Sequence, residues 1–164
     1  MSKITERLAK LGQTERDGFG FGARATSMKV PVILIGVSIK NADDAKDVEA
    51  DFFILAAGSN GAAQTTAVKD VDIWGVSISG GSVKEIDAAV DAGADFVVVD
   101  GESAPGAALK DNDTAKGFVV VADVTEERSK AIDSGLFDFI VLNGLELNFP
   151  LNVATIFDIQ EQLA

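Results

Sequence analysis

Apolar residues along this chain gather in short continuous runs that are separated by turn-forming residues. Six runs, rich in Val, Ile and Phe, have the length of strands and do not alternate with polar residues. Such strands are typical of a parallel sheet that is covered on both faces. The predicted strands are Pro31–Val37, Phe52–Ala56, Ile73–Ile78, Phe96–Val99, Phe118–Val121 and Phe139–Leu142.

One sequence pattern occurs three times in the chain, with differing similarity. "AVDAGADFVVVDGE" (89–102) has a near-copy in "AIDSGLFDFIVLNGLE" (131–146) and a fainter one in "VEADFFILAAGSN" (48–60). Each copy runs from the end of a predicted helix through an acidic residue into a strand and a polar turn. Because the strands start roughly every 20 to 23 residues, the pattern predicts compact strand–loop–helix units.

Helix signals fall between the strands. Ser82 and Glu85 form a capping box at the start of a helix, and Gly93 ends it. In the next clear helix, Thr125 is the predicted N-cap and Gly135 the residue that ends it. Further helices are predicted after the N-cap Asn41, at Lys3–Leu11, Ala62–Val68 and Pro105–Lys110, and over 150–164, where Val153, Ile156 and Phe157 with Ile159 or Leu163 form an apolar stripe.

Length and composition indicate one globular domain of 164 residues, with an N-terminal helix and Gly-rich loop (1–29), six βα units (30–149) and a C-terminal helix (150–164). No apolar run is long enough for a membrane span, and charges near the N-terminus argue against a secretion signal, so we expect a cytoplasmic protein. A net charge of −12 disfavours nucleic acid and anionic membranes as partners. The chain contains no Cys and no His, which excludes thiolate nucleophiles, Cys-ligated zinc and histidine acid–base chemistry.

The "AAVDAGADFVVVDG" joint (88–101) and its copies resemble the helix-to-strand joint of phosphate-binding (β/α)8-barrel enzymes, the group that includes indole-glycerol-phosphate synthase. The resemblance covers roughly residues 30–142 and implies an architecture rather than a reaction. Only six units are present, and a complete barrel uses eight and about 250 residues. The chain therefore resembles a partial TIM barrel, and a doubly wound, flavodoxin-like sheet is the alternative.

A partial barrel leaves two strand edges and its inner face to be covered. We therefore expect a homodimer formed through the open side. A doubly wound sheet has no open side that demands a partner.

"SISGGS" (77–82) is the leading motif for ligand binding. Two glycines and a capping serine between a strand and a helix let backbone N–H groups approach an anion. The motif resembles the phosphate loops of the barrel group, although there the site usually follows the last two strands. Ser79, Gly80, Gly81 and Ser82 are the predicted phosphate-binding residues, and an ordinary tight turn is the alternative.

Other polar residues follow the predicted strands, where parallel sheets bind ligands. Lys40, Asp100 and Asp123 are candidate catalytic residues, with Lys40 considered for Schiff-base chemistry or phosphate pairing. Mg²⁺ is the candidate cofactor, and solvated loop ends are the alternative reading of its candidate ligands. Those ligands are Asp100, Glu102, Asp123 and Glu146.

The Gly- and Phe-rich segment "GFGFGAR" (18–24) is either a loop anchored to the core or a flap against a ligand or partner. Two functions stay open. One is a partial barrel of unknown activity that self-associates. The other is an enzyme or binding protein for a phosphorylated small metabolite; whether the chain is catalytic is left undecided.

Overall fold

A computed structural model describes residues 2–11, 33–110, 114–120, 125–134, 136–144 and 153–154. Its helices are α1 (Lys3–Ala9), α2 (Val83–Asp91) and α3 (Glu126–Asp133), its 3₁₀ turns η1 (Ala42–Ala45), η2 (Ser59–Gly61) and η3 (Gly106–Leu109), and its strands β1 (Gly36–Ile39), β2 (Phe52–Leu55), β3 (Trp74–Ile78), β4 (Phe96–Val99), β5 (Ala115–Val120) and β6 (Phe139–Leu142).

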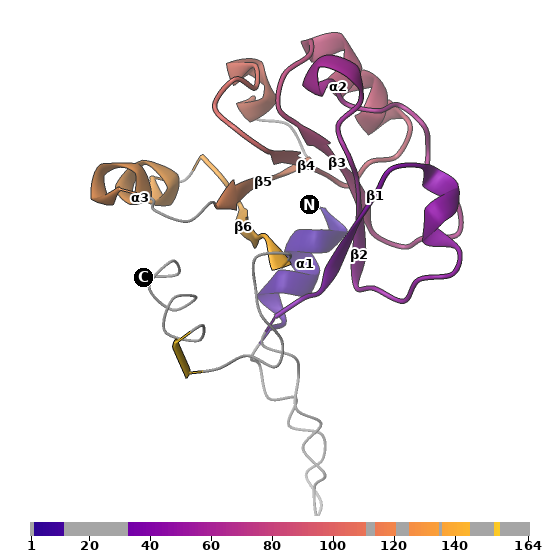
Figure 1. Ribbon diagram of the computed structural model, residues 1–164, viewed down its shortest axis with the longest axis horizontal. Helices are drawn as coiled ribbons and strands as arrows, with labels where there is room; N and C mark the ends of the chain where they lie inside the picture. The colour runs from indigo at the N-terminus through magenta and orange to yellow at the C-terminus, as the bar shows by residue number, and fades with distance from the viewer. Residues whose placement is uncertain are drawn as a thin grey trace, which may run out of the picture.

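The six strands form one parallel sheet in the order in which they occur along the chain, from β1 to β6. This confirms the predicted α/β fold of six parallel strands. Figure 1 shows the sheet curling around α1, with α2 and α3 on its outer side, as in half of a barrel. A doubly wound sheet reverses its strand order at a switch point, whereas this order contains no reversal.

Apolar side chains cover both faces of the sheet. Phe53, Leu55, Trp74, Val76 and Val97 pack outward with Ile86 and Ala89 of α2. Trp74 is 5% exposed and fills the core on this outer face. The inner cluster consists of Ile4 from α1, Ile73 just before β3, and five strand residues, namely Phe52, Ile54, Phe96, Val98 and Ala115.

The inner face carries a repeat of two strands. A glycine on each odd strand lies opposite a phenylalanine on the next even strand, in the pairs Gly36–Phe52, Gly75–Phe96 and Gly117–Phe139. A Cβ at any of these glycines would overlap the facing ring. Phe96 also contacts the rings of Phe52 and Phe139 edge-on, with ring centroids 5.6 Å apart in both pairs.

The aspartate before each of these phenylalanines belongs to the same repeat. The Asp51 carboxylate accepts the Ile35 N–H at 2.9 Å, and the Asp138 carboxylate accepts the Lys116 N–H at 2.8 Å. Asp95 instead accepts the N–H groups of Lys3 and Ile4, each at 2.8 Å. The middle copy of the repeat therefore holds the first turn of α1 against the inner face.

Several predicted boundaries differ from the structure. β1 lies later than predicted, with Ile33–Ile35 outside it, and β5 begins three residues early, at Ala115. The helix after Asn41 is a single 3₁₀ turn, and α1 ends at Ala9. The capping box of α2 and the N-cap Thr125 of α3 are confirmed, and the helix predicted at Pro105–Lys110 is the 3₁₀ turn η3. Gly135, the predicted end of α3, and most of the helix predicted over 150–164 lie outside the described residues.

The predicted helix at Ala62–Val68 is wrong, because this segment has no regular secondary structure. Its Gln64 side chain donates to the carbonyl oxygens of Ala56 at 2.6 Å and Lys40 at 3.1 Å. Ala63 and Val68 are buried against the outer core. These contacts hold the segment across the ends of β1 and β2.

Candidate functional site

The β3–α2 loop is the predicted phosphate-binding loop. The N–H groups of Ser79 and Gly80 both donate to the Gly61 carbonyl oxygen, each at 3.0 Å. The Ser82 N–H donates to the Glu85 carboxylate at 2.7 Å. Among the described residues, this leaves the N–H groups of Gly81, Val83 and Lys84 for an anion.

The Glu85 carboxylate already places a negative charge at the N-terminus of α2. The Ser82 hydroxyl donates to Glu85 at 2.8 Å, in addition to the Ser82 N–H. The hydroxyl bond first, and then the N–H bond, hold the pKa of Glu85 below its ordinary value. A carboxylate thus occupies the helix terminus where phosphate would bind, and phosphate binding by this loop stays a prediction.

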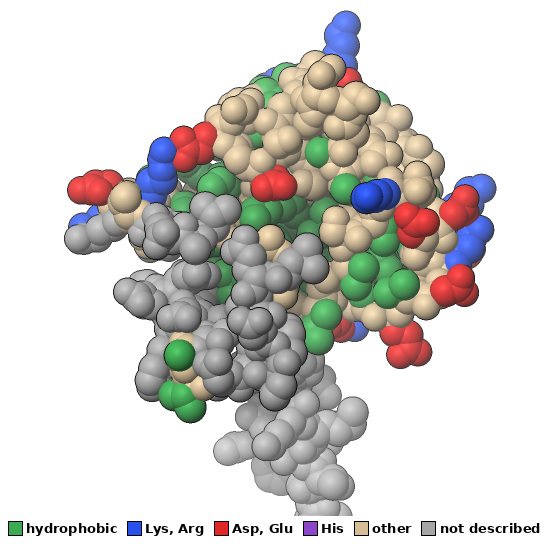
Figure 2. Space-filling view, in the orientation of Figure 1, with side chains coloured by type: hydrophobic (Ala, Val, Ile, Leu, Met, Phe, Trp, Pro, Cys, Tyr) green, Lys and Arg blue, Asp and Glu red, His purple; other side chains and the backbone are tan. Residues whose placement is uncertain are grey.

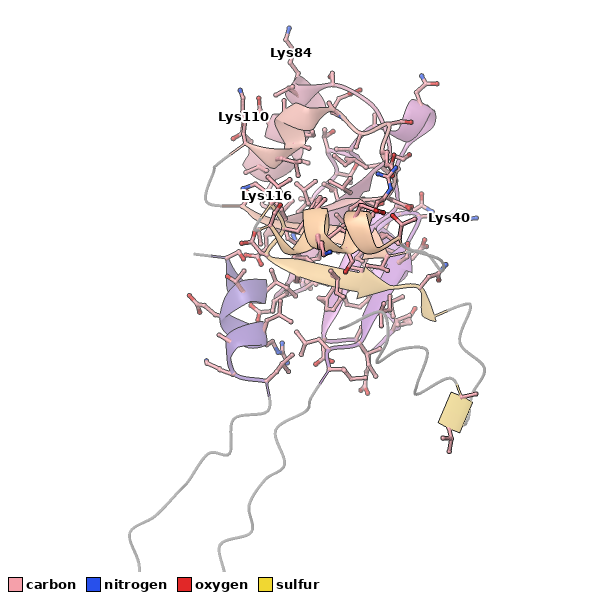
Figure 3. All side chains as sticks on the ribbon, turned by 90° about the vertical axis from the view of Figure 1, so that its left-hand side faces the viewer. Lys40, Lys84, Lys110 and Lys116 are labelled. Carbon is pink, nitrogen blue, oxygen red and sulfur yellow. The ribbon has the colours of Figure 1, made fainter. Side chains whose placement is uncertain are left out.

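Lys40 lies just after β1. Its carbonyl oxygen accepts the Gln64 amide, while its side chain is exposed. In Figure 3 the Lys40 side chain points away from the body of the molecule, and Lys84 and Lys110 project from other elements. Nothing in its surroundings supplies the burial that activates a Schiff-base lysine.

The predicted carboxylate cluster is only partly within the described residues. Asp100 follows β4 and is exposed, and Glu102 forms an exposed ion pair with Arg128 of α3. Asp123 and Glu146 lie outside the described residues, as does the 18–24 segment. Within the part of the chain that the structure describes, no three acidic side chains form a potential metal site.

A cavity that the sequence motifs did not indicate lies at the opposite ends of the strands. It has a volume of about 490 Å³ and is lined by residues that precede or begin β2 and β3, with Arg7 of α1 and Lys46 after η1. Its lining carries both signs of charge, from the basic residues Arg7, Lys46 and Lys69 and the acidic residues Asp51, Asp70 and Asp72. Because the two signs are present in equal number, and Arg7 pairs with Asp51 at 3.4 Å, the cavity has no clear preference for an anion or a cation.

The two outer strands are the most incomplete part of the molecule. Within the described residues, β1 pairs only with β2, and β6 pairs only with β5. Beside them, Ile33 and Ile35 are 68% and 63% exposed, and every residue of β6 is only half-buried. Figure 2 shows hydrophobic side chains gathered in the hollow of the molecule. Half-buried inner-face residues at these edges are Leu34, Phe139 and Val141.

Comparison with protein-family models, curated proteins and solved structures finds no match to this chain. Among the described residues, the helices are too short or too polar to cross a membrane. On structural grounds, the candidate site with the most support is the pair of outer strand edges, which have no neighbouring strand within the described residues.

Proposed function

We propose that this protein is a partial barrel that self-associates through its open sheet edges. The observation that carries the proposal is that, within the described residues, β1 and β6 each pair with one neighbouring strand only and lie beside exposed apolar residues. No catalytic centre is part of the proposal.

The physical reason for self-association is that an exposed strand edge can pair nonspecifically with other chains. An edge strand presents unpaired N–H and C=O groups that can pair with another chain. Parallel sheets are also normally covered on both faces, yet Phe139 and Val141 at the β6 edge are only half-buried. A second copy covers both the edge and the inner face, and twofold homodimers are the commonest oligomers.

Native mass spectrometry, supported by light scattering over a concentration series, tests this proposal. We expect a species of twice the 17.1 kDa mass of one chain. A monomer at every concentration would overturn self-association. Extra mass on the species, equal to a phosphorylated metabolite, would instead favour the second function considered for this chain.

A pair of lysine substitutions shows whether the edge is responsible. Ile35→Lys places a charge beside β1, where the side chain is 63% exposed. Val48→Lys makes a matched change at a residue that is 42% exposed and lies between η1 and β2. We expect Ile35→Lys to dissociate the dimer and Val48→Lys to leave it intact, because charges on an edge strand oppose strand pairing.

A further inference from the structure

The two open edges differ in kind. β1 carries the glycine of the two-strand repeat and β6 carries the phenylalanine, so the sheet begins with one half of the pattern and ends with the other. A joint between β6 and another β6 would bring two phenylalanine strands together. A joint between β6 and β1 would instead repeat a joint that the chain already makes twice.

The internal joints from an even strand to the next odd strand provide the register. In the β2–β3 joint, Phe53 faces Trp74 and Ile54 faces Gly75. In the β4–β5 joint, Val97 faces Lys116 and Val98 faces Gly117. In both, the residue two places after the even-strand phenylalanine lies opposite the odd-strand glycine.

Applied to the outer strands, this register places Ile140 opposite Ile35 and Val141 opposite Gly36. Leu34 would then face Phe139, just as Ala115 faces Phe96 within the chain. Leu34 already packs against the inner cluster, of which Ile73 and Ala115, at the equivalent positions two residues before Gly75 and Gly117, are members. The exposed Ile35 would be covered by the partner.

Backbone groups fit the same register. In the β2–β3 joint, the Phe53 N–H donates to the Ile73 carbonyl at 3.1 Å. The equivalent residues are Ile140 of β6 and Leu34, which lies two residues before β1. A parallel joint would therefore let Ile140 of one copy donate to the Leu34 carbonyl of the next.

We infer that the partner of the open edges is a second copy of this chain bound head to tail, with β6 of one copy pairing in parallel with β1 of the other. Rotation by a half-turn about the barrel axis makes the same joint twice and pairs all four edges. Head-to-tail contacts either close in this way or grow into filaments, and the half-barrel curl favours closure by two copies. The inference rests on the proposed self-association and specifies its geometry.

Cysteine cross-linking tests the joint cleanly, because the chain has no native cysteine. Ile35→Cys and Ile140→Cys are made as separate variants, mixed under conditions that allow subunit exchange, and oxidised. Paired strands hold facing Cα atoms within disulfide range. We expect a cross-linked dimer from the mixture and little from either variant alone.

Each other outcome overturns a distinct part of the argument. Efficient cross-linking of Ile140→Cys with itself would show a β6–β6 joint and overturn the head-to-tail geometry, while self-association stands. A native dimer whose mixture does not cross-link would do the same. A monomer by native mass spectrometry would overturn both proposals.

Two controls guard against false readings. Val48→Cys mixed with Ile140→Cys reports random collision, and it should cross-link far less than the Ile35→Cys mixture. Circular dichroism and native mass of each reduced variant confirm that folding and dimerisation survive the substitution. Should Ile140→Cys fail to fold, Leu142→Cys with Val37→Cys tests the same register at the next facing pair on the same side of the sheet, two residues further along.

Discussion

At the residue scale, the close approach of Gly75 to Phe96 makes a sharp test of the repeat. Phe96 is fully buried, and a Cβ at Gly75 would overlap both its ring and its carbonyl oxygen. Neither group can move freely, so we expect Gly75→Ala to lower the free energy of unfolding by roughly 1–3 kcal/mol. Urea denaturation monitored by Trp74 fluorescence would measure the loss.

Gly106 supplies the matched control for this change. A Cβ there would meet no atom within 4 Å. Gly106→Ala should change the free energy of unfolding by about 0.5 kcal/mol or less. Equal effects of the two substitutions would show that the glycine–phenylalanine contact does not limit packing.

The capping box of α2 predicts a dependence on pH. Its Ser82 donors lower the pKa of Glu85 in the folded protein, so the ionised carboxylate stabilises the fold. This contribution is fully present above the ordinary pKa of Glu85 and is lost as the pH falls through the lowered folded value. Denaturation midpoints should therefore favour wild type over Glu85→Gln near neutral pH, and the difference should shrink in acid. A difference that is independent of pH would contradict this account.

At the element scale, Asp95 is the contact that fixes α1. Its carboxylate accepts two N–H groups of α1, and Ile4 beside them is 1% exposed. Asp95→Ala removes both bonds and should cost roughly 2 kcal/mol of unfolding free energy, because hydrogen bonds to charged groups are among the stronger ones.

Asp87→Ala is the control, since Asp87 is exposed on α2. Urea denaturation compares the two variants, and hydrogen exchange should show faster exchange of the Ile4 amide in Asp95→Ala alone. If the Ile4 amide stays protected in that variant, α1 is held by packing of Ile4 rather than by the carboxylate.

Elements with continuous apolar runs were predictable, and those that depend on distant partners were not. β4 and β6 match their predicted bounds because each is a plain run of Val, Ile, Leu and Phe. β5 includes Lys116 and Gly117, which read as turn residues in sequence. Gly117 is required beneath Phe139, and the Lys116 N–H is held by Asp138, contacts that only the paired strand reveals.

The candidate loop shows the same limit. Its glycines and the Ser82–Glu85 capping box could be identified from the sequence, and the structure contains the capping box as predicted. The hydrogen bonds from the Ser79 and Gly80 N–H groups to the Gly61 carbonyl could not be predicted, because Gly61 belongs to η2, which comes before β3 in the sequence. A sequence motif shows which N–H donors a loop contains, but the tertiary contacts determine which of them remain available to bind an anion.

At the scale of the whole molecule, the repeated pattern predicted compact strand–loop–helix units, and the count of six units predicted an open side for the partial-barrel alternative. The sequence could not show which edge fits which, because that depends on register between strands. Only the aligned pairs Gly36–Phe52 and Gly117–Phe139 show that the two edges carry opposite halves of one pattern. The same aligned pairs predict that copies associate through one specific strand register rather than through nonspecific hydrophobic contact.

Charge acts against that pairing and gives a final prediction. Each copy carries a net charge of −12, so two copies repel one another before their edges meet. Raising ionic strength from about 10 mM to about 150 mM shortens the screening distance from roughly 30 Å to roughly 8 Å. The dimer dissociation constant, measured by sedimentation, should therefore fall over this range, with little further change from screening above it. A constant that rises with salt would mean that ion pairs, rather than strand edges and apolar side chains, hold the copies together.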